Sequence, residues 1–458
     1  MILEKINQYI WCGPALALIL CVGAYLTVRT GFSQFKMFPK AMGIFMASFR
    51  KRKSNSGTTP FRALCTALAA TVGTGNIAGV AGAISIGGPG SVFWMWVAAV
   101  LGMVIKFAEA VLSVQYRQRN QVGEYIGGPM YMIRNGMGTK WKWLAGLYAF
   151  FGVVAAFGVG NSTQINTAIA GINSVLTAYG GKETQLRNLS LGILFAVTIG
   201  LVLLGGIKRI GIAAETLVPV ASLIYIALGI GIIIIRFKEI PSVFLSIVTG
   251  AFQPKAVTGG VIGSCMKTIS VGISRGVFTN EAGMGTAGIA HSAANVKHPV
   301  EQGLMGIMEV FIDTVVICTI TAFVILCSGV QISYGIDTGA ELTAQAFSAV
   351  YGNWTKIFLA VAITCFALAT VLGWGLYGIR CAEYLFGNRS FAIFVGAQII
   401  MTILGAVLST KTVWLLAEMV NGLMAIPNLI AVTCLTSELI KLLSGYRAEI
   451  KLGSKIRK

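Results

Sequence analysis

The stretch TVGTGNIAG, residues 71–79, interrupts a long apolar run with closely spaced glycines and with the polar side chains of Thr71, Thr74 and Asn76. A second stretch, NEAGMGTAG at residues 280–288, interrupts another apolar run in the same way. Glycine favours an unwound backbone, whose free N–H and C=O groups tolerate burial in apolar surroundings only beside a ligand, an ion or water. The two stretches therefore predict two broken helices that surround a buried polar site.

The composition indicates that those breaks lie within membrane-spanning helices. The 458 residues are 56% hydrophobic and only 11% charged, with a mean hydropathy of +0.79, whereas soluble domains carry roughly 25% charged residues. Apolar runs of about 20 residues, each long enough to cross a bilayer, recur along the whole chain. They lack the alternation of barrel strands, so the sequence predicts an all-α membrane protein.

We predict about eleven membrane-spanning helices. Their expected ranges are roughly 8–28, 61–86, 90–116, 143–176, 188–206, 211–235, 258–291, 300–328, 355–385, 390–409 and 412–442. The basic, amphipathic stretch 31–53 is expected on the membrane surface. The stretches 242–253 and 338–352 are too short or too polar to span, and are expected as connections on the opposite side.

The two interrupted spans are five helices apart, so they cross the membrane in opposite directions. This spacing predicts two inverted repeats of five helices, over residues 61–236 and 258–443, joined by a connection at 237–257. An extra helix and the surface stretch occupy residues 1–60, and a basic tail occupies 444–458. Paired, glycine-interrupted helices in inverted halves are the best sequence pointer to the central site of a secondary transporter.

The formal net charge of +19 is distributed unevenly among the connections. Basic residues gather after the first, third and fifth spans and in the tail, whereas the intervening connections are short, rich in glycine or acidic. By the positive-inside rule, this places the amino terminus outside and the carboxyl terminus in the cytoplasm. Such clustering is an orientation signal in a membrane protein, so no nucleic-acid partner is expected, and the isolated cysteines suggest neither a metal site nor disulfides.

Two glycine patterns resemble motifs of other protein classes. The stretch at 73–79 lacks the strand and the basic residue of a phosphate-binding loop, although close packing of small residues remains an alternative to a binding site. The sequence GISRG around Ser274 matches the G-x-S-x-G of serine hydrolases. An intramembrane protease would need His291 as its base, but 17 residues of continuous helix would place the two side chains about 25 Å apart.

Ionisable residues inside apolar spans are costly, so each is expected in a site or an ion pair. Lys106 and Glu109 are three residues apart, and we favour a pair between them on one helix face. Glu309 and Asp313 share a face and a sign, and their role is left open between holding a proton and facing Arg275 or Lys267. Glu281, at the second break, either braces the unwound backbone or takes part in ion coupling.

Polar side chains in two further spans are candidates for the same site. Gln164 lies in a polar cluster of the fourth span, where hydrogen bonding between helices is the alternative. Thr370 and Trp374 are four residues apart on one face of the ninth span. The hydroxyl is suited to a cation and the indole to the wall of an apolar pocket.

Taken together, these segments resemble the alanine or glycine:cation symporter family. The resemblance extends over nearly the whole chain and is most specific at residues 71–81, 87–96, 275–285 and 311–314. It implies the inverted five-plus-five helix fold of many sodium symporters, with one extra helix. It also implies a multi-pass protein of the plasma or inner membrane that is not an enzyme, and no cofactor apart from Na+ as the coupling ion.

The resemblance also implies roles for individual residues. The N–H groups around Gly73, Thr74, Gly75 and Asn76 would bind the substrate carboxylate. Carbonyl groups near Thr279, Asn280 and Gly283, together with Gln164, would take the ammonium group, and Trp374 would cap a pocket for a small side chain. A sodium ion would lie between the carbonyl groups of Ala69 and Val72 and the Thr370 hydroxyl, although Ala369 stands where related sequences often have a second hydroxyl.

The expected function is cation-coupled symport of alanine or glycine by alternating access, with Na+ as the expected cation. Proton coupling in the same fold stays open. A uniform pore is disfavoured because no row of filter residues is present, and the protease using Ser274 is a remote alternative.

Overall fold

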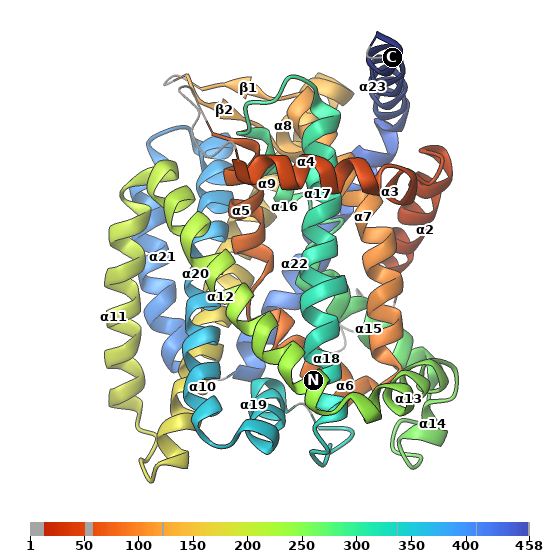
Figure 1. The fold of residues 1–458 in the computed structure, drawn as a ribbon. Helices are drawn as coiled ribbons and strands as arrows, with labels where there is room; N and C mark the ends of the chain where they lie inside the picture. The colour runs from red at the N-terminus through yellow and green to blue at the C-terminus, as the bar shows by residue number, and fades with distance from the viewer. Residues whose placement is uncertain (1–12, 51–57, 121–122, 337, 409, 457–458) are drawn as a thin grey trace.

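The computed structural model describes residues 13–50, 58–120, 123–336, 338–408 and 410–456. Within them the chain is almost entirely helical, as predicted (Figure 1). The first five residues of the span expected at 8–28, and residues 51–53 of the surface stretch, lie outside the described ranges.

The amino-terminal half forms long helices joined by short turns. It contains α2 (Pro14–Arg29), α3 (Ser33–Lys36), α4 (Phe38–Arg50), α5 (Pro60–Thr71), η1 (Thr74–Asn76), α6 (Ala78–Gly87), α7 (Ser91–Gln115), β1 (Gln118–Arg119), β2 (Tyr125–Ile126), α8 (Pro129–Met132), η2 (Ile133–Met137), η3 (Thr139–Trp141), α9 (Lys142–Phe157), η4 (Gly158–Ser162), α10 (Thr163–Ala178), α11 (Gln185–Leu203) and α12 (Gly206–Ile235). The strands form a small antiparallel hairpin, with Gln118 opposite Ile126.

The carboxyl-terminal half continues in the same manner. It contains η5 (Phe237–Glu239), α13 (Ile240–Phe252), α14 (Pro254–Val257), α15 (Cys265–Asn280), α16 (Thr286–Ser292), α17 (Pro299–Val310), η6 (Phe311–Cys318), α18 (Thr319–Cys327), α19 (Gly339–Tyr351), α20 (Trp354–Phe386), α21 (Ser390–Val407), α22 (Thr410–Cys434) and α23 (Thr436–Ile456).

The number of spans is lower than predicted when length and composition alone are counted. Seven helices of the described ranges are long and apolar enough to cross a membrane, or nine if each of two bent pairs is one span. One bent pair is the predicted first break, where α5 and the segment Thr74–Gly87 meet at 59°. The count of eleven is therefore not confirmed, since α2 is short and α15 with α16 does not pass as one span.

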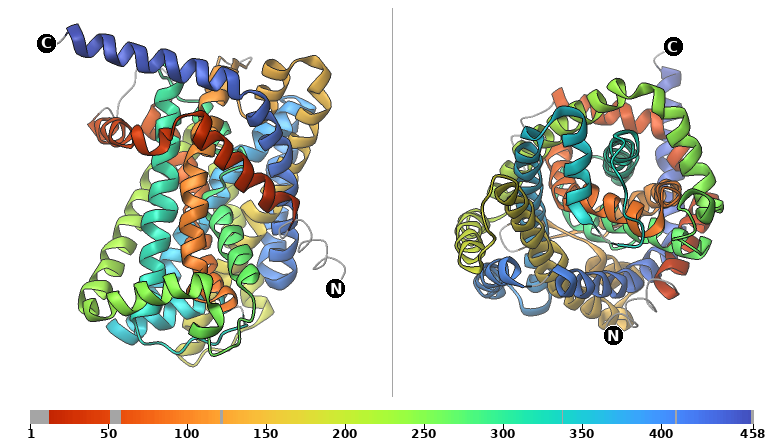
Figure 2. Two further views of the ribbon diagram at one scale, coloured as in Figure 1. Left: turned by 90° about the vertical axis from the view of Figure 1, so that its right-hand side faces the viewer. Right: turned by 90° about the horizontal axis from the view of Figure 1, so that it is seen from below.

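Two predicted boundaries are wrong. The span expected at 258–291 begins only at Cys265, because residues 258–264 form turns. The span expected at 412–442 ends at Cys434, where α22 and α23 bend by 59°. Residues 444–456 continue α23, which lies across the end of the bundle (Figure 2).

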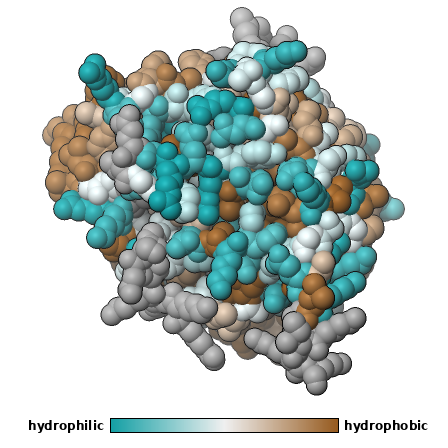
Figure 3. Space-filling view, turned by 90° about the horizontal axis from the view of Figure 1, so that it is seen from above, coloured by the Kyte–Doolittle hydropathy of each residue, from teal (hydrophilic) through white to brown (hydrophobic). Residues whose placement is uncertain are grey.

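The two ends of the bundle carry different elements (Figure 1). The amphipathic α4, the hairpin and α23 lie at one end, and α13, α14 and α19 lie at the other. The sequence predicted this arrangement, with stretch 31–53 on one side and stretches 242–253 and 338–352 on the opposite side. The end that carries α4 and α23 is largely hydrophilic (Figure 3).

Close packing of small residues joins α15 to α7. A Cβ added at Gly272 would lie 2.4 Å from the Ser91 carbonyl oxygen, and one at Gly276 would lie 3.0 Å from Ala98 Cβ. These glycines let the two helices approach closely. The GISRG stretch is therefore part of a helix-packing face, within an unbroken helix.

Candidate functional site

The first break begins where α5 ends. Val72 N–H still donates to the Leu68 carbonyl oxygen at 2.7 Å, but Gly73 N–H donates to Asn76 Oδ1 at 2.9 Å. In a continuous helix, Gly73 N–H would bond to the Ala69 carbonyl instead. The side chain of Asn76 thus releases the Ala69 carbonyl oxygen from the helical ladder.

Gln164, a candidate for this site, lies against the first break. Its Oε1 accepts from Thr74 Oγ1 at 3.0 Å and is 3.4 Å from Thr74 N, which is long for a hydrogen bond. Its Nε2 donates to the Val159 carbonyl oxygen at 3.1 Å, inside the π-helical segment η4. π-helical turns often occur at functional sites because they re-aim side chains and free backbone groups.

Thr370 of α20 also faces the first break. A Cβ added at Gly73 would lie 2.6 Å from Thr370 Oγ1, and one at Gly373 would lie 2.9 Å from the backbone nitrogen of Ala70. Among the described residues, Thr370 Oγ1 has no hydrogen-bond partner, although the residue is only 1% exposed. An unpaired, buried hydroxyl is costly, so this oxygen is available to a ligand or a cation.

The second break follows α15. Glu281 caps the helix in the left-handed conformation, with φ of 55°, and Gly283 and Gly285 also have positive φ, at 94° and 76°. Glu281 Oε1 accepts from the Trp374 indole at 2.6 Å, and Oε2 accepts from Thr286 Oγ1 at 2.6 Å. The carboxylate therefore braces the break, one of the two roles left open by the sequence, and ties it to α20.

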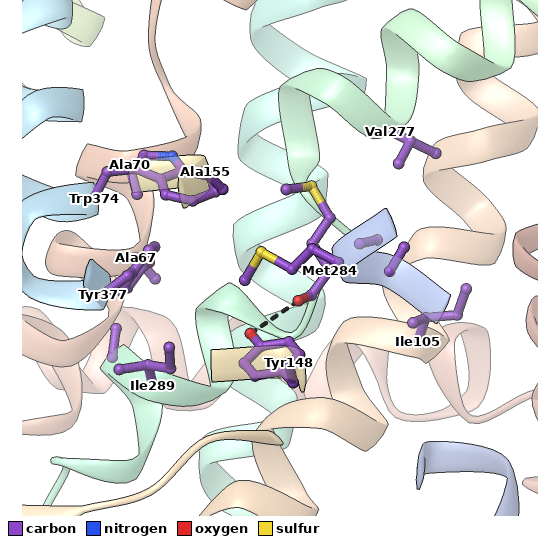
Figure 4. Close-up of a cluster of buried hydrophobic side chains, with 14 of the residues drawn as sticks. Ala67, Ala70, Ile105, Tyr148, Ala155, Val277, Met284, Ile289, Trp374 and Tyr377 are labelled. Carbon is purple, nitrogen blue, oxygen red and sulfur yellow. Dashed lines mark hydrogen bonds between the residues drawn. The ribbon is translucent and has the colours of Figure 1, made fainter. Parts of the chain in front are cut away.

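Trp374 is fully buried one helical turn after Thr370. It lies beside Ala70 and Ala155 (Figure 4). A Cβ added at Gly160 would lie only 2.3 Å from Trp374 Cβ, so the glycine in η4 lets the tryptophan pack this closely. The indole is thus fixed in place by packing and by its hydrogen bond to Glu281.

The predicted pair of Lys106 with Glu109 is wrong. Lys106 Nζ lies 3.0 Å from Glu309 Oε1 on α17, because the tertiary partner replaces the neighbour on the same helix. Glu309 Oε2 lies 2.9 Å from His291 Nε2, and His291 Nδ1 lies 2.6 Å from Gln302 Nε2. Glu309 therefore faces Lys106 and His291, which were not the basic partners expected for it.

Glu109 instead contacts the second break. Its Oε1 accepts from Gly283 N–H at 2.9 Å, from Gly285 N–H at 3.1 Å and from Asn428 Nδ2 at 2.6 Å. Asn428 also donates to the Gly283 carbonyl oxygen at 2.8 Å. A Cβ added at Gly283 would face Ile19 and Leu429. The structure thus places Gly283 among α2, α7 and α22, with none of these contacts made to the first break.

The middle of the first break lies against the residues that directly precede the second break. A Cβ added at Gly75 would lie 3.1 Å from Thr279 Cγ2. Asn280 Nδ2 donates to Thr314 Oγ1 at 3.1 Å, and Asn76 Nδ2 donates to Asp313 Oδ1 at 2.7 Å. The π-helical segment η6, which carries residues 313 and 314, therefore joins both breaks. Of the predicted residues, the structure brings together Ala69, Val72, Gly73, Thr74, Gly75, Asn76, Gln164, Thr279, Asn280, Thr370 and Trp374.

The geometry does not support a serine protease. Ser274 lies within the continuous helix α15, without the sharp turn that exposes a nucleophile. Both ring nitrogens of His291 already have partners, Glu309 and Gln302. The hydrolase reading of GISRG is therefore wrong.

Residues 1–458 match the sodium:alanine symporter family. The chain belongs to this family. An uncharacterized transporter from Haemophilus influenzae is 41% identical over 458 residues, which cover 99% of this chain and 97% of that protein. The sodium/alanine symporter AgcS from Methanococcus maripaludis is 39% identical over 461 residues, covering 100% of this chain and 98% of AgcS.

A solved structure supports the fold. MhsT in complex with L-phenylalanine aligns with a TM-score of 0.59 at 14% identity, covering 85% of this chain and 99% of MhsT. Together with the family, this confirms the predicted all-helical transporter fold. The chain is a multi-pass membrane protein and a cation-coupled amino-acid symporter, and it is not an enzyme.

The sequence did not single out Asn428, which contacts Gly283, or Gln302, which contacts His291. Asn428 is a polar residue in an apolar helix, next to the helix-interior Pro427, and that combination was its only local signal. Gln302 fixes His291 from the first turn of α17. Both act through contacts between different helices, which spacing along one helix does not reveal.

Proposed function

We propose that this transporter couples the inward movement of sodium to uptake of alanine or glycine. The observation that carries the proposal is the unpaired, buried hydroxyl of Thr370 beside the unwound end of α5. The Ala69 carbonyl is released from Gly73 N–H, and Val72 leaves the helical conformation with ψ of 91°. Carbonyl and hydroxyl oxygens suit a hard monovalent cation, so we assign Na+ to these three residues.

The amino acid would bind beside that ion. Its carboxylate would take the backbone N–H groups from Gly73 to Asn76, near the positive end of α6. The long contact of Thr74 N with Gln164 Oε1 is one that a charged acceptor would replace with a stronger bond. The ammonium group would face Gln164 Oε1 and the carbonyl groups of Thr279 and Asn280.

Trp374 would limit the size of the substrate. Its position is fixed by Gly160 and by the hydrogen bond to Glu281, so the indole cannot withdraw easily to admit a larger side chain. Gly283 contributes to the shape of the second break, since its carbonyl oxygen already accepts from Asn428. This arrangement supports small neutral amino acids as the substrate class.

Transport would proceed by alternating access, with the two breaks exposed to one side at a time. The end that carries α4, the hairpin and α23 is rich in basic residues, so we assign it to the cytoplasm. By the same rule, we assign the amino terminus to the outside.

The test is uptake of radiolabelled alanine into proteoliposomes under an inward gradient of sodium, of potassium or of protons. Accumulation under sodium alone supports the proposal, and glycine competing with alanine supports the substrate class. If alanine accumulates under none of the three gradients, the proposal is contradicted.

Proton coupling is the second candidate, and one observation favours it. Asp313 is fully buried and accepts from Asn76 of the first break and from Thr314 Oγ1, so a proton there would alter the contacts of that break. Accumulation under the proton gradient alone, lost in Asp313→Asn, would select this candidate over sodium.

A further inference from the structure

Glu109 is a fully buried carboxylate on α7 that the proposed binding site does not use. One of its oxygens, Oε1, accepts three N–H groups, two from the backbone of the second break and one from Asn428 on α22. Lys106, the neighbouring cation on the same helix, is within ion-pair distance of Glu309. Glu109 therefore bonds to the break directly and to Asn428, which itself donates to the Gly283 carbonyl oxygen.

The second break needs such an acceptor. Residues 281–285 separate α15 from α16, so Gly283 and Gly285 donate to no helical carbonyl of their own segment. Unsatisfied N–H groups are costly in the membrane interior. Both glycines have positive φ. Because glycine adopts positive and negative φ about equally readily, contacts from outside the segment must fix this conformation.

The other contacts at the break do not replace Glu109. Asn280 Oδ1 accepts from Ala282 N–H at 3.0 Å, and Glu281 accepts from Thr286 and Trp374. These bonds hold the two flanks of the break. Met284 N–H donates to the Glu281 carbonyl oxygen within the break, whereas the Gly283 and Gly285 N–H groups are held from α7.

We propose that Glu109 is a positioning residue for transport, which holds the middle of the second break in the shape that presents Thr279, Asn280 and Glu281 to the binding site. The role requires an acceptor oxygen at the reach of a glutamate side chain, and it does not require a negative charge. The inference rests on the proposed function, because its consequence is measured on the amino-acid site.

A pair of substitutions separates reach from charge. Glu109→Gln keeps a carbonyl oxygen at the same distance and removes the charge. Glu109→Asp keeps the charge and is one methylene shorter, so it cannot reach both glycine N–H groups in the same geometry. We expect alanine KM within about threefold of wild type for Glu109→Gln and raised about tenfold or more for Glu109→Asp, the factor for one lost hydrogen bond.

Hydrogen–deuterium exchange over residues 281–288 provides a readout that does not depend on transport. We expect faster exchange in Glu109→Asp and wild-type exchange in Glu109→Gln, each measured on detergent-purified, monodisperse protein. The same measurement on Glu109→Ala, which removes the acceptor, is expected to match Glu109→Asp even if that variant is inactive.

Only one pattern of results supports the proposal: near wild-type transport and exchange in Glu109→Gln, together with impaired transport and faster exchange in Glu109→Asp. Loss in Gln with activity in Asp would mean that charge is what matters, and equal behaviour of the two variants, active or inactive, would equally overturn the inference. Failure of the proposed function is distinguishable, because wild-type protein would then show no alanine uptake under any gradient, while the exchange experiment would still report on the break.

Discussion

The first and second breaks are built alike in one respect and differently in another. Each has an asparagine whose Oδ1 caps a freed backbone N–H, Asn76 for Gly73 and Asn280 for Ala282. At the first break, the Thr74 N–H has a long contact with the neutral Gln164, and the Asp313 carboxylate is bonded to the side chain of Asn76. The second break is held by two carboxylates, Glu109 and Glu281.

This difference explains which break would bind the substrate carboxylate. Two backbone N–H groups of the second break, those of Gly283 and Gly285, already have a charged acceptor in Glu109, and a further anion there would meet the repulsion of two buried carboxylates. The N–H groups of the first break have weaker partners, which an anionic ligand displaces at lower cost. We therefore infer that the second break is a fixed scaffold and the first is the ligand-responsive segment.

The largest expected effect comes from filling the space between the first break and α20. Gly73→Ala places a methyl group 2.6 Å from Thr370 Oγ1, so the break or α20 must shift. We expect alanine uptake to fall by about a hundredfold or more, because a displacement of about 1 Å in a positioned site has that effect.

Gly43→Ala is the matched control, since a Cβ at Gly43 meets nothing within 4 Å. Uptake by that variant should equal wild type. A normal rate in Gly73→Ala would mean that the first break and Thr370 do not form one site.

A smaller effect is expected from removing the unpaired hydroxyl. Thr370→Ala should raise the sodium concentration for half-maximal uptake about tenfold, and Thr370→Ser should restore it, because one oxygen ligand contributes on the order of 1–2 kcal/mol. The control is Thr364→Ala on the same helix, whose hydroxyl donates to the Ala360 carbonyl oxygen. An unchanged sodium dependence in Thr370→Ala would move the cation elsewhere.

Trp374→Phe tests the link between the second break and α20. It removes the indole donor to Glu281 and leaves an aromatic ring in place. We expect about a fivefold higher KM for alanine, together with better uptake of larger neutral amino acids, since a loosened wall admits a larger side chain. Trp143→Phe, at a position that is 63% exposed, serves as the control. Unaltered selectivity would show that the indole does not wall the pocket.

The smallest effect is expected at Ser274, which lies in α15 away from the middle of either break. Ser274→Ala should leave alanine uptake within about twofold of wild type, as for most substitutions away from specific contacts. Loss of activity there, measured in the same liposomes, would call the helix-packing role of GISRG into question.

The sequence predicted those parts of the site that depend on motifs within a single segment. The glycines at 73 and 75, and Glu281 within the second interruption, mark the breaks directly. Four-residue spacing also placed Thr370 and Trp374 on one face. These features depend on backbone chemistry and helical periodicity, which a single segment reveals.

What the sequence missed depends on contacts between segments. The three-residue spacing favoured Lys106 with Glu109, yet Glu309 lies close enough to take the cation and Glu109 turns to the break. The bend at Leu435 and the π-helical segments were likewise not predicted, because tertiary packing sets them. The span count also exceeded the helices that pass by length and composition.

The most direct test of the central claim is alanine binding to purified protein, measured by calorimetry with and without sodium, in wild type and Thr370→Ala. Cation and amino acid on one break must strengthen each other's binding by the same factor. We predict that sodium raises alanine affinity at least about tenfold in wild type and has little effect in Thr370→Ala. An equal increase in both proteins would contradict a shared site at the first break.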